Sequence, residues 1–117
     1  MKPLLPLDDA LAKAVISGER GWSAEIHRLR GELTGRLPYL DPAKVEESFR
    51  TALAIAREQG TRGYELRAAT SLARLWREQG RRGEARDLLA PVYGWFTEGF
   101  DTQDLKEAKA LLEELAA

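Results

Sequence analysis

Apolar residues recur along this chain at steps of three and four positions, with polar residues between them. These steps follow the 3.6-residue turn of an α-helix, in which such residues share one face. The pattern therefore predicts an all-α protein of about six amphipathic helices arranged in antiparallel pairs. The expected helices cover residues 7–17, about 20–37, 42–59, 63–79, 83–97 and 102–115.

Residues with special backbone preferences mark the ends of these helices. Asp41 precedes Pro42, which is typical of a helix start because the Asp side chain accepts backbone N–H groups and proline fits the first helical position. Gly60 and Gly80 follow apolar stripes and are expected to end them, Gly60 in the left-handed conformation. Pro91 lies inside the fifth stretch, where it removes a backbone hydrogen bond, so we expect a kink or a break there.

The chain resembles itself when it is shifted by 42 residues, and the offset falls to 40 and then 39 further along. Amphipathic helices align on their apolar stripes by chance, but chance would not also align the residues of the turns. The aligned turns are Gly18-x-Arg20-Gly21-Trp22 and Gly60-x-Arg62-Gly63-Tyr64. An internal repeat of this length predicts stacked helical pairs that share one core between neighbours.

One unit carries a pattern that resembles the tetratricopeptide repeat. In that repeat, the first helix has a large-small pair of residues and an aromatic residue, which pack against small residues of the second helix. The pattern reads Leu72-Ala73-x-x-Trp76-x-x-x-Gly80-x-x-x-x-Ala85-x-x-x-Leu89. Repeats near 40 residues look like those of MalT-type regulators. The chain also resembles, over nearly all of residues 7–115, the C-terminal region of large bacterial signalling ATPases, often fused to adenylate/guanylate cyclase or DNA-binding domains. The segments that carry this resemblance are SAEIHRLRGEL, FRTALAIAREQG and RAATSLARLWREQGRRGEARDLLAPVYGWFTEGFDTQDLKEAKALLEEL.

This resemblance implies an α-solenoid of helix pairs whose ATPase or cyclase activity lies outside this chain. We expect residues 1–117 to form one domain, with a half repeat at 7–36, full repeats in the region 42–97 and a C-terminal helix at 102–116, as a fragment of a longer chain. The first expected helix would then lack a partner. The nearby Leu4, Leu5 and Leu7 predict an apolar amino-terminal edge, through which the chain could form a homodimer.

Composition narrows the functional classes. The 18 Lys and Arg residues nearly balance the 19 Asp and Glu residues, so no overall field favours nucleic acid or an anionic membrane. Cysteine is absent, which removes disulfides and thiolate chemistry and fits a cytoplasmic protein. We expect neither a signal peptide nor a membrane span, because prolines and acidic residues interrupt the apolar residues near the amino terminus.

Motifs for catalysis and cofactors are missing. The only histidine, His27, could be assisted by Glu25 or Glu32 but has no nucleophile nearby beyond Ser23, so it is interpreted as a structural or surface residue. The chain contains no phosphate-binding loop, dinucleotide fingerprint or calcium loop, and we expect no cofactor and no metal. The aromatic residues Trp95, Phe96 and Phe100 are interpreted as core residues.

The exposed sides of alternate helices are expected to line a concave groove. The groove candidates are Arg28, Arg67, Thr70, Arg74, Arg77, Lys106 and Lys109, beside Glu25, Glu32 and Glu113. Guanidinium groups there could bind carboxylates of a protein segment, a peptide or the chain's own upstream domains. A solvated charged face with local pairs such as Arg74 with Glu78 is the alternative. The sequence thus predicts a non-catalytic interaction or sensor module, or alternatively a capping or dimerisation module.

Overall fold

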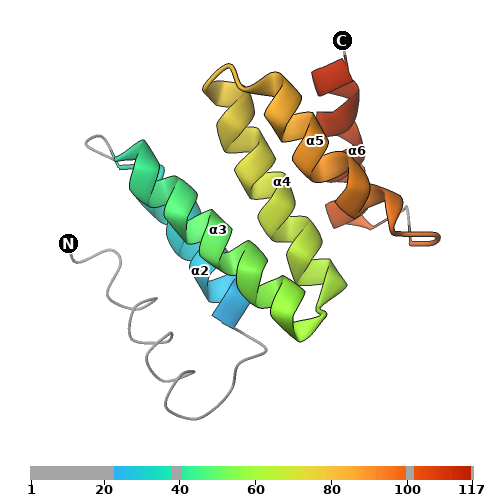
Figure 1. The fold of residues 1–117 in the computed structure, drawn as a ribbon, viewed down its shortest axis with the longest axis horizontal. Coiled ribbons are helices and arrows are strands. Elements are labelled where there is room, and N and C mark those ends of the chain that lie inside the picture. The colour runs from blue at the N-terminus through green and yellow to red at the C-terminus, as the bar shows by residue number, and fades with distance from the viewer. Residues whose placement is uncertain (1–22, 38–40, 100–101, 117) are drawn as a thin grey trace.

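The computed structural model describes residues 23–37, 41–99 and 102–116, and these residues form five α-helices (Figure 1). The helices are α2 Ser23–Thr34, α3 Pro42–Gln59, α4 Arg62–Glu78, α5 Arg82–Gly94 and α6 Gln103–Ala116. The all-α prediction is confirmed for these five helices, whose bounds differ from the expected ones by at most three residues. The expected helix at 7–17 and the apolar edge at residues 4–7 lie outside the described residues.

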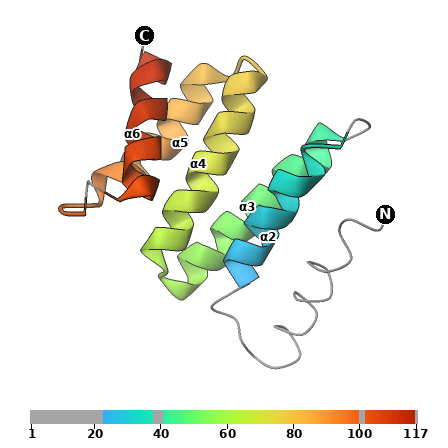
Figure 2. The ribbon, with the colours of Figure 1, turned by 180° about the vertical axis from the view of Figure 1, so that it is seen from behind.

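Consecutive helices pack side by side in alternating directions, and α4 lies at the centre (Figure 1). Helix α4 contacts α2 and α3 on one side and α5 and α6 on the other. Seen from behind, α2 and α6 lie in front of α3 and α5 (Figure 2). The contacts of α4 with both α2 and α6 place these three helices in one row.

The apolar stripes of the helices form the core. Alanines without accessible surface alternate with large side chains, which lets neighbouring helices approach closely. The buried apolar cluster consists of Val45, Phe49, Ala52, Leu53, Leu66, Ala68, Ala69, Leu72, Ala73, Trp76, Ala85, Leu89, Val92, Leu105, Ala108, Leu111 and Leu115. Residues from α3, α4, α5 and α6 all contribute, so these helices share one continuous core.

The turns α3–α4 and α4–α5 have the same local sequence, REQG, at residues 57–60 and 77–80. Gly60 and Gly80 adopt φ angles of 68° and 79°, a left-handed conformation that costs glycine little. The N–H of the residue after each glycine donates to a carbonyl five positions earlier, at 3.0 Å from Thr61 to Ala56 and at 2.8 Å from Arg81 to Trp76. Both turns therefore use the same glycine C-cap.

The start of α3 is also confirmed. Asp41 adopts an extended conformation, and its Oδ1 accepts a hydrogen bond from the N–H of Ala43 at 3.0 Å, with Pro42 in the first helical position. Among the described residues of the connection before α3, no glycine has a positive φ. Helix α2 packs mainly against α3 and also contacts α4.

That packing depends on Gly31. A Cβ atom at this position would lie 2.7 Å from Cε1 and 2.9 Å from Cδ1 of Phe49, closer than carbon atoms approach. The missing side chain therefore allows the backbone of α2 to rest directly on the Phe49 ring.

Two expectations near the end of α5 need correction. Of the kink or break expected at Pro91, the break is wrong, because helix α5 continues through this residue to Gly94, while the kink stays a prediction. Pro91 and Asp87, whose carbonyl loses its helical donor, are both exposed, so water can replace that hydrogen bond.

Trp95 is not a core residue, because α5 ends just before it and its side chain is 53% exposed beneath the guanidinium of Arg62. Phe96 does pack against the core, and Phe100 lies outside the described residues.

The carboxylate of Glu46 on α3 joins three elements. It accepts hydrogen bonds from Nε of Arg50 at 2.7 Å, from Nε1 of Trp76 at 3.1 Å and from Nη1 of Arg81 at 3.1 Å. The guanidinium carbons of Arg50 and Arg81 lie 5.3 and 4.5 Å from the ring centroid of Trp76. Burial raises the pKa of Glu46, but these hydrogen bonds and the charge of Arg50 outweigh it and lower the pKa below 4.5.

Replacing Gly31 by Ala is expected to destabilise the protein by about 1–3 kcal/mol, because the added methyl group must displace the Phe49 ring. The free energy of unfolding from urea titration measures this change. Gly63→Ala is the matched control, since a Cβ at Gly63 meets no atom within 4 Å. It should leave stability unchanged or raise it by up to about 1 kcal/mol through helix propensity. Equal effects of both changes would contradict close α2–α3 packing.

Glu46→Gln is expected to cost about 1–2 kcal/mol at neutral pH, because charge-assisted hydrogen bonds become neutral ones. Since the pKa of Glu46 is lowered in the folded state, its charge stabilises the fold above the unfolded value. That advantage over the Gln variant should be lost as the pH falls below 4.5 and through the lowered pKa. Urea titrations of both proteins between neutral and acidic pH measure it. A difference that does not change with pH would argue against this assignment.

Candidate functional site

Four of the groove candidates line one small cavity in the row formed by α2, α4 and α6. The cavity has a volume of about 150 Å³. Its lining consists of Arg28, Arg67, Thr70, Ser71, Arg74, Asp104 and Glu107. Helix α6 therefore contributes carboxylates to this lining.

Arg67 is held by carboxylates from two other helices. Its Nε donates to Oδ2 of Asp104 on α6 at 2.8 Å, and its Nη1 donates to Oε2 of Glu25 on α2 at 3.3 Å. The hydrogen bond that Arg67 donates to Asp104 is the largest influence on the pKa of Arg67, which is raised although burial opposes it. Arg67 therefore joins α2, α4 and α6, and two carboxylates balance its charge.

Arg28 shares Glu25 with Arg67. Its Nε donates to Oε1 of Glu25 at 2.7 Å, its Nη2 contacts the same oxygen, and its Nη1 lies 3.4 Å from the hydroxyl of Ser71 on α4. Glu25 is only 8% exposed, so these two guanidinium groups compensate a carboxylate that is almost removed from water.

Arg77 and Thr70 are also engaged within the protein. Nη1 of Arg77 donates to Glu114 on α6 at 3.0 Å, and the Thr70 hydroxyl is buried and donates to the carbonyl of Leu66 at 2.8 Å. Lys106 and Lys109 are exposed on α6 and have no ionic partner among the described residues. They are absent from the lining of the cavities around α4, so their place in a groove stays a prediction.

Arg74 differs from the other arginines of this face. It makes no hydrogen bond or ion pair within residues 23–37, 41–99 and 102–116, although it is half-buried. The pair with Glu78 is not formed, and Oε1 of Glu78 instead lies 3.7 Å from Nη2 of Arg77. Arg74 also lines three neighbouring cavities, so a half-buried cation that has no ionic partner among the described residues lies where they meet.

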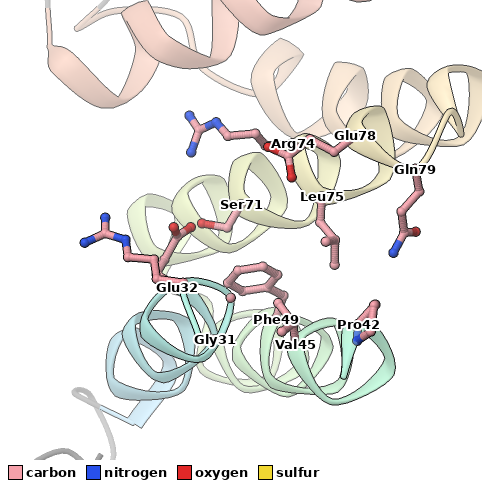
Figure 3. A pocket seen from close by; sticks show the side chains of 12 residues that line it. Gly31, Glu32, Pro42, Val45, Phe49, Ser71, Arg74, Leu75, Glu78 and Gln79 are labelled. Atoms are coloured by element: carbon pink, nitrogen blue, oxygen red, sulfur yellow. The ribbon is translucent and has the colours of Figure 1, made fainter. Parts of the chain in front are cut away.

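The largest of these three is a cleft of about 370 Å³ between α4 and the α2–α3 pair (Figure 3). Its apolar part is formed by Val45 and Phe49 from α3 and Leu75 from α4. The side chains of Phe49 and Leu75 lie between α4 and the α2–α3 pair (Figure 3). The rim is charged and polar, with Arg74 on α4 and Glu32 on α2.

The third cavity, of about 300 Å³, lies on the α2 side of Arg74. It is lined by Leu29 and Leu33, which belong to the predicted apolar stripe of the second helix but are each 38% exposed. The sequence did not single out either these leucines or the cleft as functional features.

The residues that could take part in catalysis or bind a metal ion are not grouped together in the described part of the chain. His27 makes no hydrogen bond to a described residue, and its pKa is lowered, mainly by burial and also by the charge of Arg30. No three His, Asp or Glu side chains in the described ranges are grouped so that they could hold a metal ion. No described helix is both long and apolar enough to cross a membrane.

Replacing Arg67 by Gln is expected to cost about 1–3 kcal/mol of stability, because the nearly buried Glu25 loses one of its two cationic partners. Arg77→Gln is the matched control, since Glu114 is half exposed and water can replace the lost contact, at a cost of about 0.2–1 kcal/mol. Urea titration compares the two variants. Equal losses would show that the three-helix connection at Arg67 is no stronger than a surface pair.

A scan against protein-family models found no match, and searches of curated proteins and of solved structures found no match either. The functional reading of this site therefore rests on its own residues and geometry.

Proposed function

We propose that this chain is a non-catalytic interaction or sensor module that binds a protein segment on the face formed by α2, α4 and α6. The segment could belong to another protein or to upstream domains of a longer signalling ATPase or cyclase-type regulator. The observation that carries the proposal is Arg74, whose guanidinium has no carboxylate partner in the described part of the chain, whereas Arg67 and Arg77 on the same helix each have at least one.

Burial of an unpartnered guanidinium is unfavourable unless an anion approaches it. Arg74 is half-buried between cavities with apolar and polar linings, and an Asp or Glu side chain of a bound segment would supply that anion through a bidentate contact. The exposed Leu29 and Leu33 on the neighbouring helix offer apolar surface to the same segment.

The proposed architecture is a short array of tetratricopeptide-like helix pairs. Three features support it: the row α2, α4 and α6, the antiparallel packing of consecutive helices, and the two turns with the same REQG sequence and glycine cap. In such arrays the alternate helices that form a row present the binding surface. Capping or dimerisation through residues 4–7 rests on a part of the chain outside the described residues.

Selection from a random peptide library tests the binding function. Selected peptides should be enriched in Asp or Glu next to apolar residues, and Arg74→Gln should weaken their binding about tenfold or more, as expected for loss of a charge-assisted contact. Fluorescence anisotropy of labelled peptides measures the affinities.

Arg86→Gln serves as the control, because Arg86 on α5 is exposed and likewise lacks an ionic partner among the described residues. It should leave peptide affinity unchanged. Peptides that bind both variants and the unchanged protein equally well would remove the Arg74 face from consideration as the binding site.

A further inference from the structure

We propose that residues 7–17 of this chain dock as a helix on the side of α2 that exposes Leu29 and Leu33, and that they compete there with an external protein segment. Residues 7–17 lie outside the described part of the chain, whereas the surface proposed for them lies on a described helix. The docking is independent of the proposed function, and only the competition rests on it.

The internal repeat identifies Leu29 and Leu33 as contact positions. A shift of 42 residues places them on Ser71 and Leu75 of α4. Both residues of α4 face the helix pair before it: the Ser71 hydroxyl accepts a hydrogen bond of 3.4 Å from an arginine of α2, and Leu75 lines the cleft together with Phe49 of α3 (Figure 3). Helix α2 carries leucines at the same two positions, but each is 38% exposed. The side of α2 that corresponds to this contact side of α4 is therefore apolar and partly exposed.

The apolar stripe of residues 7–17 matches a buried stripe of α3. The same shift places Leu7 on Phe49 and Leu11 on Leu53, which are only 3% and 6% exposed in the core. A helix with such a stripe is stable in water only when apolar surface covers the stripe. In the aligned part of the structure α4 packs on α3, so we expect α2 to pack on residues 7–17 in the same way.

The turn sequence before α2 supports the same arrangement. Residues 18–21 align with residues 60–63, where Gly60 caps α3 with a φ of 68° and the chain returns along α4. Gly18 stands at the position of Gly60, so the sequence predicts the same reversal of the chain before α2. The connection also keeps residues 7–17 close to α2, because a short tether gives an effective concentration on the order of mM.

Docking of residues 7–17 would cover part of the proposed binding face. The two exposed leucines line one cavity with Arg36 and Arg74, which have no ionic partner among the described residues. In residues 7–17, two aspartates directly follow the first leucine, which is the acidic and apolar composition expected of a segment bound to this face. An external segment must displace these residues, so its apparent affinity falls with the fraction of molecules in which the face is free.

Paramagnetic NMR on the ¹⁵N-labelled full chain tests the docking. The chain has no cysteine, so Lys13→Cys, on the polar side of the predicted helix, can carry a single nitroxide label. Amide signals of α2 around Leu29 and Leu33 should lose intensity relative to the same protein with the label reduced, while those of α6 should not. Leu29→Asp should restore the α2 signals, because a carboxylate is unfavourable beneath an apolar stripe.

Ala110→Asp is the matched control, since Ala110 is an exposed alanine of α6, and it should leave the signal loss on α2 unchanged. The same spectra show whether each variant is folded. No loss on α2, an equal loss on α2 and α6, or a loss on α2 that persists in the Leu29→Asp variant would each overturn the proposal.

Fluorescence anisotropy with the selected peptides tests the competition. Leu11→Asp should weaken the docking and raise peptide affinity at least about threefold, because the face is free in more molecules. Lys13→Asp introduces the same side chain on the polar side of the predicted helix and should leave the affinity unchanged. No rise in either variant, or an equal rise in both, would show that residues 7–17 do not compete.

The two measurements separate this proposal from the proposed function. If peptides bind while the label reports no contact with α2, the docking is wrong and the protein-segment site stands. If the label reports contact while the selection yields no peptide, the docking stands without the protein-binding function.

Discussion

The structure depends on the burial of α4 on several sides at once, because this helix contacts all four other described helices. Its buried residues include polar ones, and each needs a partner inside the protein. Glu65 accepts hydrogen bonds from Arg57 and Arg62, Ser71 receives one from Arg28, and the Thr70 hydroxyl is bonded to its own helix. Arginines from α2 and α3, together with Arg62 at the start of α4 itself, therefore supply hydrogen bonds to the buried polar residues of the central helix.

The three arginines on one face of α4 differ in whether they pair with carboxylates of other helices. The charge of Arg67 is balanced by Glu25 and Asp104, and that of Arg77 by Glu114, so these two residues connect helices. Arg74 lies between them in sequence on the same helix and has no such partner among the described residues. Of the three arginines on this face of α4, Arg74 is thus the one without an ionic partner in the described part of the chain.

Helix positions and turns could be predicted from sequence because they depend on local chemistry. The Asp41 cap and the glycine stops at Gly60 and Gly80 require only neighbouring residues, and all three lie where expected. The exposure of Trp95 could not be predicted, because it depends on where α5 ends. That Arg74 has no ionic partner in the described ranges could not be predicted either, since this depends on which carboxylates α2 and α6 bring near α4.

The two REQG turns also bear on how the chain folds. The two glycines are needed for their positive φ angles and not for space, because a Cβ at Gly60 or Gly80 would meet no other atom within 4 Å. Each turn joins helices that follow one another in the chain and pack on each other. Helix α2 likewise packs on its chain neighbour α3, where Gly31 contacts Phe49. Contacts between consecutive helices thus run through the whole described part of the chain, and a topology rich in such local contacts favours fast folding.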